Sequence, residues 1–201
     1  MIECIQQYLN NVQCELGKEF HTINAENVQK AAKIILDSEA QGGRVHVTGV
    51  GKPGHVAGYI ASLLSSTGTS AYELHATEAV HGSSGQVRAG DVVIAISNSG
   101  ETMELEATIK TLISNGAYII SCCGNENSTL ASLSDVCLLA HVDEEGDRLN
   151  KPPRASILSE IIILQCLSVV LQEVKQLDLQ QYVKWHPGGS LGKSILENDQ
   201  R

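Results

Sequence analysis

The stretch DVVIAISNSGET, residues 91–102, contains the pattern that decides the fold. Asp91–Ile96 is strongly apolar and rich in β-branched side chains, which predicts a buried strand. Ser97–Gly100 consists of turn residues, and Glu101–Ser114 predicts a helix that ends at Asn115-Gly116. A buried strand that enters a helix through a short polar turn is the repeating unit of a parallel α/β sheet.

The same unit recurs on both sides of this stretch. Helices are predicted from about His55 to Ser66 and near Ser128–Ser134. Further short apolar runs predict four more strands, at Arg44–Val50, Ala71–Leu74, Tyr118–Cys123 and Val136–His141. Such alternation predicts an α/β fold with three αβα layers, a doubly wound five-stranded parallel sheet of the flavodoxin-like or Rossmann-like type.

The two ends of the chain frame this core. Residues 2–16 and 24–39 predict two polar helices, the second with Asn24 as its N-cap. Ala155–Lys175 predicts a long apolar helix, either buried or in a subunit contact, because it has few polar positions. The tail at 185–193 has the composition of a loop. We therefore expect one domain over residues 1–201, with N-terminal helices in 1–39, the core in 40–175 and a C-terminal segment in 176–201.

Composition excludes several classes of function. The 201 residues carry a net charge of −9 and only 3% aromatic side chains, so neither a basic surface nor a stacking platform for nucleic acid is expected. The most apolar stretch, Ile161–Gln172, is shorter than the roughly 18 residues of a membrane span, and Met1–Cys4 lacks the basic start of a signal peptide. The six cysteines lack zinc-type spacing, so we expect reduced thiols and no metal site. The sequence predicts a soluble cytoplasmic protein.

The turn at residues 97–102 gathers hydrogen-bond donors at a helix start. Ser97, Ser99 and Thr102 supply hydroxyls, and Asn98 supplies an amide. A helix N-terminus has unpaired N–H groups and partial positive charge, which suit a phosphate group. An ordinary helix cap is the alternative, but a single capping residue is enough for that purpose. This turn therefore predicts phosphate binding.

The earlier turn, Gly49–Gly54, is open to more than one interpretation. It matches the G-x-G-x-x-G pattern of dinucleotide sites, with Glu73 placed to contact a ribose. However, Pro53 removes an N–H donor where pyrophosphate would lie, and Lys52 suits a single phosphate or a substrate oxygen. A turn that merely requires small residues is a further alternative. Because ligands of open α/β sheets lie outside the carboxyl ends of the strands, both turns should line one crevice.

Five segments form a wider pattern: Gly49-x-Gly51-Lys52-x-Gly54-His55, Ser66-Thr67-Gly68, Glu78-Ala79-x-His81-Gly82, Ile94-x-Ile96-Ser97-Asn98-Ser99-Gly100-Glu101 and His186-Pro187-Gly188-Gly189-x-Leu191-Gly192. Over about residues 40–193 this pattern resembles the sugar isomerase (SIS) domain, and most closely the arabinose 5-phosphate isomerases. The Ser-x-Ser-Gly loop is common to SIS domains, whereas the third and fifth segments point to the arabinose-phosphate branch.

The resemblance implies the interconversion of D-ribulose 5-phosphate and D-arabinose 5-phosphate, which enters the synthesis of the lipopolysaccharide sugar Kdo. It implies no cofactor, and a homotetramer whose sites lie at subunit interfaces, where a C-terminal histidine comes from a neighbour. The chain ends at Arg201 without the paired CBS domains of many relatives. We therefore expect a SIS-only form or a shortened chain.

Isomerisation through an enediol needs a base, a group that moves protons between two oxygens, and a phosphate anchor. His81 and His186 are the proton-transfer candidates, because imidazole titrates near neutral pH. The residues that align with family motifs imply a catalytic set of Lys52, His81, Glu104, Glu145 and His186, with Glu144 as an available neighbour of Glu145. By the same alignment the phosphate group would be held by Gly51, Ser97, Asn98, Ser99 and Thr102.

Three segments depart from the family pattern. Pro53 replaces a serine, Ser83-Ser84 replaces an Asp-Leu pair, and Pro152–Ser156 replaces a Ser/Thr-rich stretch. These departures bear on the identity of the sugar more than on the fold. The alternative function is a non-catalytic regulator that binds a sugar phosphate through residues 97–102. A nicotinamide-dependent dehydrogenase would rest on the first glycine turn alone.

Overall fold

The strands pair into one all-parallel sheet, as the sequence predicts. The computed structural model describes residues 2–186, and its strands are β1 (Val45–Gly49), β2 (Ala71–His75), β3 (Val92–Ile96), β4 (Tyr118–Cys123) and β5 (Val136–Leu139). They lie in the order β2-β1-β3-β4-β5, and every neighbouring pair is parallel. The winding direction therefore reverses between β1 and β3.

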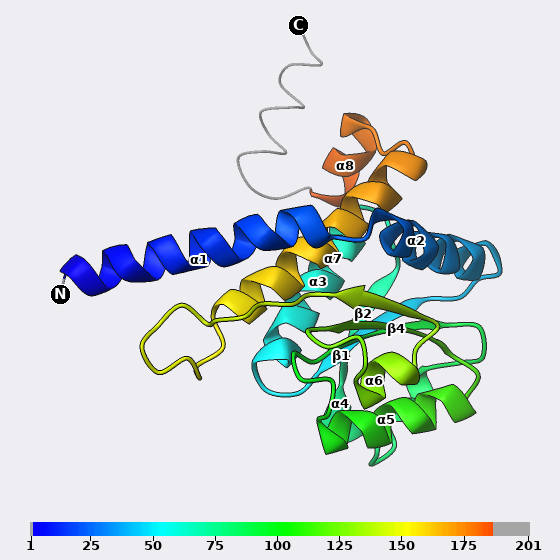
Figure 1. The fold of residues 1–201 in the computed structure, drawn as a ribbon. Coiled ribbons are helices and arrows are strands. Elements are labelled where there is room, and N and C mark those ends of the chain that lie inside the picture. The colour runs from blue at the N-terminus through cyan, green and yellow to red at the C-terminus, as the bar shows by residue number, and fades with distance from the viewer. Residues whose placement is uncertain (1, 187–201) are drawn as a thin grey trace, which may run out of the picture.

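Helices cover both faces of the sheet, which confirms the three-layer α/β fold (Figure 1). One face carries α2 (Ala25–Ala40), α3 (Lys52–Ser66) and α7 (Ala155–Val174), with α1 (Ile2–Thr22) packed on α7. The other face carries α4 (Ala76–Ala79), the short 3₁₀ helix η1 (Ser83–Gln86), α5 (Met103–Ser114) and α6 (Thr129–Ser132). Along β3, Ile94 packs into the first layer and Val93 and Ala95 pack into the second.

Three helices begin or end away from their predicted bounds for identifiable reasons. Helix α3 begins at Lys52 rather than near His55, because proline is well tolerated in a first helical turn. Helix α5 begins at Met103, after the hydroxyl-rich turn. Helix α1 continues to Thr22, because two of its glutamates are anchored by contacts with distant segments. The N-cap role of Asn24 is confirmed, since its side chain accepts a hydrogen bond from the N–H of Asn27.

Helix α7 (Ala155–Val174) is longer than its most apolar stretch, Ile161–Gln172, which by itself is too short to span a membrane. Within residues 2–186 it is the one helix long and apolar enough to cross a membrane, judged by length and composition only. Half of that window is buried inside the protein, where α7 packs against α2, α3 and α1. This extent of burial is typical of a helix that packs in the core of a protein. It also encloses Glu160, whose two carboxylate oxygens have no hydrogen-bond partner among the described residues.

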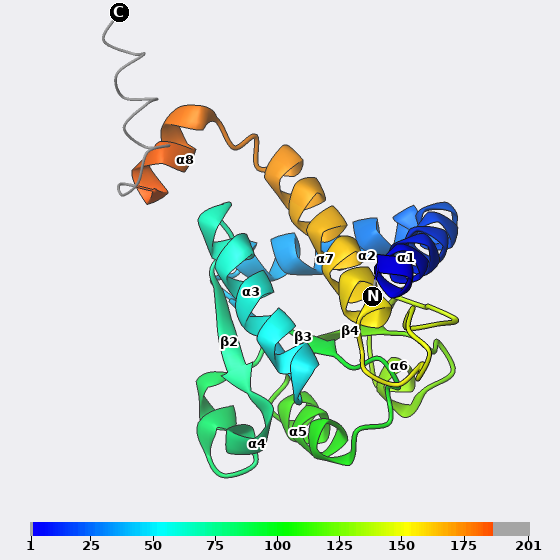
Figure 2. The same cartoon turned by 90° about the vertical axis from the view of Figure 1, so that its left-hand side faces the viewer.

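A further helix, α8 (Leu179–Trp185), precedes the segment predicted to be a loop and overlaps it only at Trp185. Asp178 caps it, and its side chain accepts a hydrogen bond from the N–H of Gln181. Figure 2 shows α8 beyond the end of α3 that is remote from α4 and α5. Most of the predicted His-Pro-Gly-Gly loop, from Pro187 onward, lies outside the described residues.

Candidate functional site

The carboxyl ends of the central strands bring the two predicted turns together. In the sheet register Gly49 of β1 lies beside Ile96 of β3, and Ile96 lies beside Cys122 of β4. The turns that follow these strands therefore share one edge, which we call the carboxyl edge. The winding direction of the sheet reverses there between β1 and β3, which is where doubly wound proteins bind ligands. The two turns thus lie at one edge, and that they line a common crevice stays a prediction.

The turn at residues 97–102, called the phosphate loop from here on, is held by its own hydroxyl groups. The buried Ser97 Oγ accepts a hydrogen bond from the N–H of Gly100 at 3.2 Å and lies 3.1 Å from Thr102 Oγ1. Asn98 and Ser99 are exposed. Thr102 occupies the N-cap position of α5, but its side chain makes no capping hydrogen bond. The start of α5 thus lacks the ordinary cap that would explain so many polar residues.

The segment after β4 supports the phosphate loop from behind. Leu130 donates its N–H to the Gly100 carbonyl at 3.0 Å, and Gly124 donates to the Asn98 carbonyl at 2.9 Å. Gly100 has φ +68°, and a Cβ there would lie 2.2 Å from Ser128 Oγ, so no larger residue fits. These contacts hold the loop in one shape before any ligand arrives.

Glu101, the acidic residue of the phosphate loop, directs its carboxylate toward the start of α6. Glu101 accepts hydrogen bonds from the Thr129 hydroxyl at 2.7 Å and from the Thr129 N–H at 2.8 Å. The hydroxyl bond, followed by the backbone bond, lowers the pKa of Glu101. The carboxylate is therefore committed to the start of α6, which leaves Asn98 and Ser99 as the exposed polar groups of the loop.

The glycine turn places Lys52 at the first position of α3. A Cβ on Gly49 would lie 2.8 Å from the Pro53 carbonyl carbon, so the turn needs glycine to pass so close to the helix. Gly51, at φ +68°, is exposed, and its carbonyl accepts a hydrogen bond from the Gly54 N–H at 3.1 Å. The exposed Lys52 forms no ion pair within residues 2–186. Its charge is available to a ligand.

A cavity of about 190 Å³ adjoins this turn on the side of β2. Glu73, the acid expected at a dinucleotide site, helps to line it, together with His55 and His75. The Glu73 carboxylate lies against Gly58 of α3, where a Cβ would come within 2.9 Å of it. The strand order β2-β1-β3-β4-β5 is that of the flavodoxin-like fold rather than of the dinucleotide-binding Rossmann fold.

Two predicted catalytic residues are exposed on elements that begin at the carboxyl edge. His81 follows α4, which is joined directly to the end of β2, and its backbone N–H donates to the Glu78 carbonyl. Glu104 lies in the first turn of α5, next to the phosphate loop. No hydrogen bond or ion pair joins the side chain of either residue to another described residue, so both are available to a ligand.

Glu145 differs from Lys52, His81 and Glu104, because its carboxylate is already hydrogen-bonded within the fold. It is buried and accepts hydrogen bonds from the Ser156 hydroxyl and the Arg154 N–H, both at 2.6 Å, and from the Ser156 N–H at 3.2 Å. These bonds attach the loop before α7 to the helix start, whereas Glu144 is exposed. A catalytic role for either glutamate remains a prediction.

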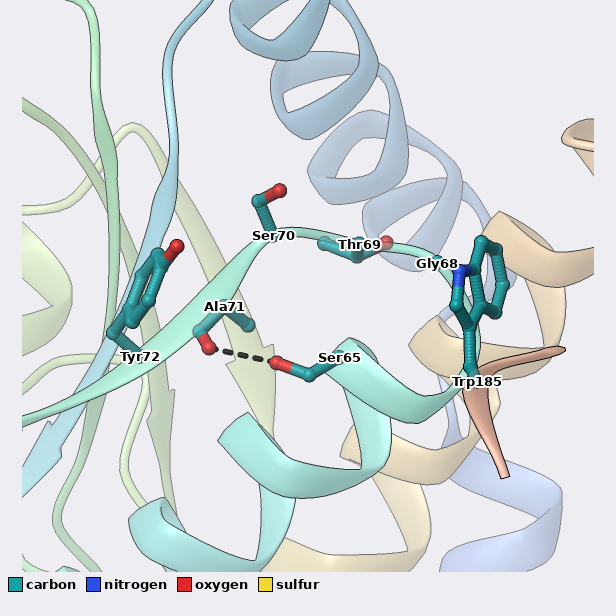
Figure 3. A pocket seen from close by; sticks show the side chains of 7 residues that line it. All are labelled: Ser65, Gly68, Thr69, Ser70, Ala71, Tyr72 and Trp185. Atoms are coloured by element: carbon teal, nitrogen blue, oxygen red, sulfur yellow. Dashed lines mark hydrogen bonds between the residues drawn. The ribbon is translucent and has the colours of Figure 1, made fainter. Parts of the chain in front are cut away.

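His186 lies at the other end of the sheet, which we call the amino edge. Its Nδ1 is 2.8 Å from the Tyr182 carbonyl, and its ring stacks on Tyr182 at 3.9 Å. The neighbouring Trp185 packs on Gly68, just beyond the end of α3 (Figure 3). Helix α3 has 15 residues, so Lys52 at its start is about 22 Å from that end. One chain therefore does not bring its own His186 to Lys52.

The amino edge has a cavity of its own, of about 300 Å³ (Figure 3). It lies between the end of α3 and the start of β2, and Tyr72 and Trp185 line it on opposite sides. The Ser65 hydroxyl, which lines this cavity, already donates a hydrogen bond to the Ala71 carbonyl at 2.7 Å. Neither turn predicted to bind the ligand contributes to this cavity. Within residues 2–186 no cluster of His, Cys, Asp or Glu side chains could hold a metal ion.

These features define a doubly wound α/β protein whose carboxyl edge carries a loop fixed by its own hydrogen bonds. Residues 40–169 match the SIS domain, and the chain belongs to the SIS domain family. It is 36% identical over 85% of its length to the arabinose 5-phosphate isomerase KdsD of Francisella tularensis, and 34% identical over 94% to that of Pseudomonas aeruginosa. It spans 52% and 59% of those two proteins, so about half of their lengths.

A solved structure is also similar to this chain. The chain resembles an Escherichia coli CFT073 protein in complex with arabinose 5-phosphate, with a TM-score of 0.80 and 33% identity. That likeness covers 92% of this chain and 97% of the other. The chain is thus a SIS-domain protein of the phosphosugar isomerase family, related to arabinose 5-phosphate isomerases.

Proposed function

We propose that the protein is an aldose–ketose isomerase that interconverts D-arabinose 5-phosphate and D-ribulose 5-phosphate through an enediol. One observation carries the proposal: the preformed phosphate loop lies beside the unpaired Lys52, at the point where the winding of the sheet reverses. Its relatives named as arabinose 5-phosphate isomerases, and the structural neighbour bound to that sugar phosphate, support the choice of sugar.

The phosphate loop would anchor the 5-phosphate group. Asn98 and Ser99 are exposed there, and the start of α5 adds N–H groups and a partial positive charge. The anchor fixes the open sugar chain relative to the side chains around the carboxyl edge, which turns a random encounter into an oriented one. Lys52 then stabilises the negative charge that develops on the carbonyl oxygen as the enediol forms.

Proton transfer requires a base and a carrier. A base removes the proton from C2 of the aldose and returns it to C1, while a second group moves a proton between O1 and O2. Glu104 and His81 are the exposed candidates that this chain supplies, with Glu144 and Glu145 on the loop before α7. The reaction only rearranges hydrogen atoms, so it needs neither an oxidant nor a reductant.

We further propose that His186 enters the site from a second copy of the chain in a homotetramer. The position of Trp185 on Gly68 keeps His186 of the same chain at the amino edge, so a neighbour must provide it. The proposed setting is the cytoplasm, where the product would feed the synthesis of Kdo.

The test is turnover of D-arabinose 5-phosphate without added cofactor, followed as the appearance of ketose. We expect Lys52→Ala to lower kcat/KM by about 100-fold or more, since it removes the charge that faces the oxyanion. Lys110→Ala is the matched control, because Lys110 pairs with Glu106 on the exposed side of α5. His81→Ala and His186→Ala should each be inactive, and mixing Lys52→Ala with His186→Ala chains should restore part of the activity.

A second candidate is a regulator that binds the sugar phosphate without converting it. The observation that favours it is the engagement of Glu145 in three hydrogen bonds at the start of α7. A sugar phosphate that raises the melting temperature without any turnover would support the regulator. Stabilisation by NAD but not by the sugar phosphate would contradict both candidates.

A further inference from the structure

Two free thiols face one another beneath the phosphate loop. Cys123 at the end of β4 and Cys137 in β5 have their sulfur atoms 3.6 Å apart, and neither is in a disulfide. Cys137 is opposite Ser121 in the register of the two strands, so Cys137, Ser121 and Cys123 share one face of the sheet. Cys123 is fully buried and Cys137 is half-buried, so a small solute can approach the pair from the side of Cys137.

The pair is chemically primed because one thiol stabilises the thiolate of the other. The hydrogen bond from Cys137 lowers the pKa of Cys123 to about 6, against the opposing effect of burial. The same bond raises the pKa of Cys137. Near neutral pH the two sulfur atoms therefore share one proton, and the charge belongs to the pair. A thiolate is the form of cysteine that attacks oxidants.

Cys123 is also part of the support of the phosphate loop. Its sulfur lies 3.3 Å from the Asn125 carbonyl oxygen, to which it donates a hydrogen bond when protonated, and 3.7 Å from Ser128 Oγ. Ser128 is the residue against which Gly100 packs, and Gly124, next to Cys123, donates to the Asn98 carbonyl. A displacement of the Cys123 sulfur thus acts on two contacts that fix the shape of the loop.

We propose that Cys123 and Cys137 are an oxidation site at which a hydroperoxide forms a disulfide and thereby weakens the phosphate loop. The thiolate attacks the peroxide O–O bond, so that the oxygen that carries hydrogen joins sulfur as a sulfenic acid, and the other oxygen takes a proton from solvent and leaves as water or an alcohol. The second thiol then displaces the sulfenic hydroxyl, which leaves as water, and the S–S bond closes. Two electrons pass from the sulfur atoms to the peroxide.

Closing this bond must move the strand ends. Bonded sulfur atoms lie about 2.05 Å apart, whereas these are 3.6 Å apart on diagonally related positions of β4 and β5. The movement draws the Cys123 sulfur away from Asn125 and Ser128. The effect on ligand affinity rests on the proposed function, because it assumes that the loop binds the phosphate group.

The experiment treats the full chain with hydrogen peroxide, with Cys4→Ser and Cys14→Ser introduced to remove two exposed thiols. We expect the tryptic peptide 111–148 to lose two hydrogen atoms in mass, and its halves to stay joined after cleavage at Glu126. Cys122→Ser should keep this linkage and Cys137→Ser should abolish it. Failure to form the linkage under conditions that oxidise Cys4 and Cys14 of the unaltered chain would overturn the proposal.

Affinity for D-arabinose 5-phosphate, and for inorganic phosphate as the simpler probe, is then measured before oxidation, after it, and after reduction with dithiothreitol. We expect oxidation to weaken binding about tenfold, the equivalent of one or two lost hydrogen bonds, and reduction to restore it. Cys137→Ser should bind equally well with and without peroxide. A linked peptide with unchanged affinity would refute the coupling to the loop. If the reduced chain binds neither probe, the proposed function fails, while the linked peptide would still support the oxidation site.

Discussion

The two edges of the sheet differ in how their polar groups are used. At the amino edge the buried Asp91 accepts hydrogen bonds from the N–H groups of Arg44 and Arg88, both at 2.9 Å, and contacts His46 at 3.2 Å. Lys175 there donates to the Thr69 hydroxyl at 2.6 Å, to Glu39 and to the Gly68 carbonyl. The charges of Asp91 and Lys175 are thus satisfied within the fold.

At the carboxyl edge the corresponding groups are left open. Lys52, His81 and Glu104 are exposed and form no side-chain hydrogen bond or ion pair with another described residue, and Thr102 does not cap its helix. The backbone beneath them is nevertheless fixed, by Ser97 within the loop and by the segment after β4. If the carboxyl edge is the site, as proposed, a fixed backbone with unpaired side chains marks it better than cavity size does, because the amino-edge cavity of about 300 Å³ is larger than the carboxyl-edge cavity of about 190 Å³.

The most disruptive change should be Asp91→Ala at the amino edge. It leaves two backbone N–H groups and His46 without their acceptor in a buried site, which we expect to lower the free energy of unfolding by about 3 kcal/mol. Urea denaturation measures this loss, with Asp135→Ala, which removes one acceptor from an exposed residue, as the milder control. Affinity for sugar phosphate should be unchanged in the folded fraction, and a large change would break the division between the edges.

Gly100→Ala tests the carboxyl edge. The added methyl group meets Ser128 and the backbone has φ +68°, so the phosphate loop must shift. We expect sugar-phosphate affinity to fall about tenfold or more, the equivalent of at least one lost charge-assisted hydrogen bond, as calorimetric titration would show. Gly42→Ala is the matched control, since Gly42 has φ +81° with open space around it. Equal affinity in the two variants would contradict a preformed loop.

The smallest expected effect is a pH dependence at the amino edge. Burial lowers the pKa of His46, so the unfolded chain binds a proton that the folded chain resists. Stability is then full above the ordinary histidine pKa of about 6.5 and falls as the pH drops toward the lowered value.

The measurement is the difference in unfolding free energy between wild type and His46→Gln as a function of pH. Glu160 is present in both chains, so its contribution cancels in the difference. This matters because burial raises the pKa of Glu160 to about 8, and its effect on stability runs with pH in the opposite direction to that of His46. If this difference in unfolding free energy does not change between pH 5 and 8, His46 does not contribute to the pH dependence of stability.

The sequence predicts the sheet well because buried parallel strands are continuous apolar runs. Tyr118–Cys123 is predicted at both ends, and the position of the phosphate loop follows from the strand before it. Contacts between distant segments leave no such pattern. Neither the hydrogen bonds of Glu145 to residues at the start of α7, nor the contact of Gly100 with Ser128, can be seen in local sequence. Helix α4, with four residues, is too short for periodicity to define it, whereas α6 lies within the helix predicted near Ser128–Ser134.

The packing of Trp185 on Gly68 affects how activity depends on protein concentration. If each site takes His186 from another chain, as proposed, then an isolated chain is inactive even when folded, since its own histidine is held beyond the far end of α3, a helix about 22 Å long. Activity per milligram would then fall on dilution and recover on concentration, following the association equilibrium of the subunits rather than their unfolding. The amount of protein in a cell would itself set the fraction of working sites.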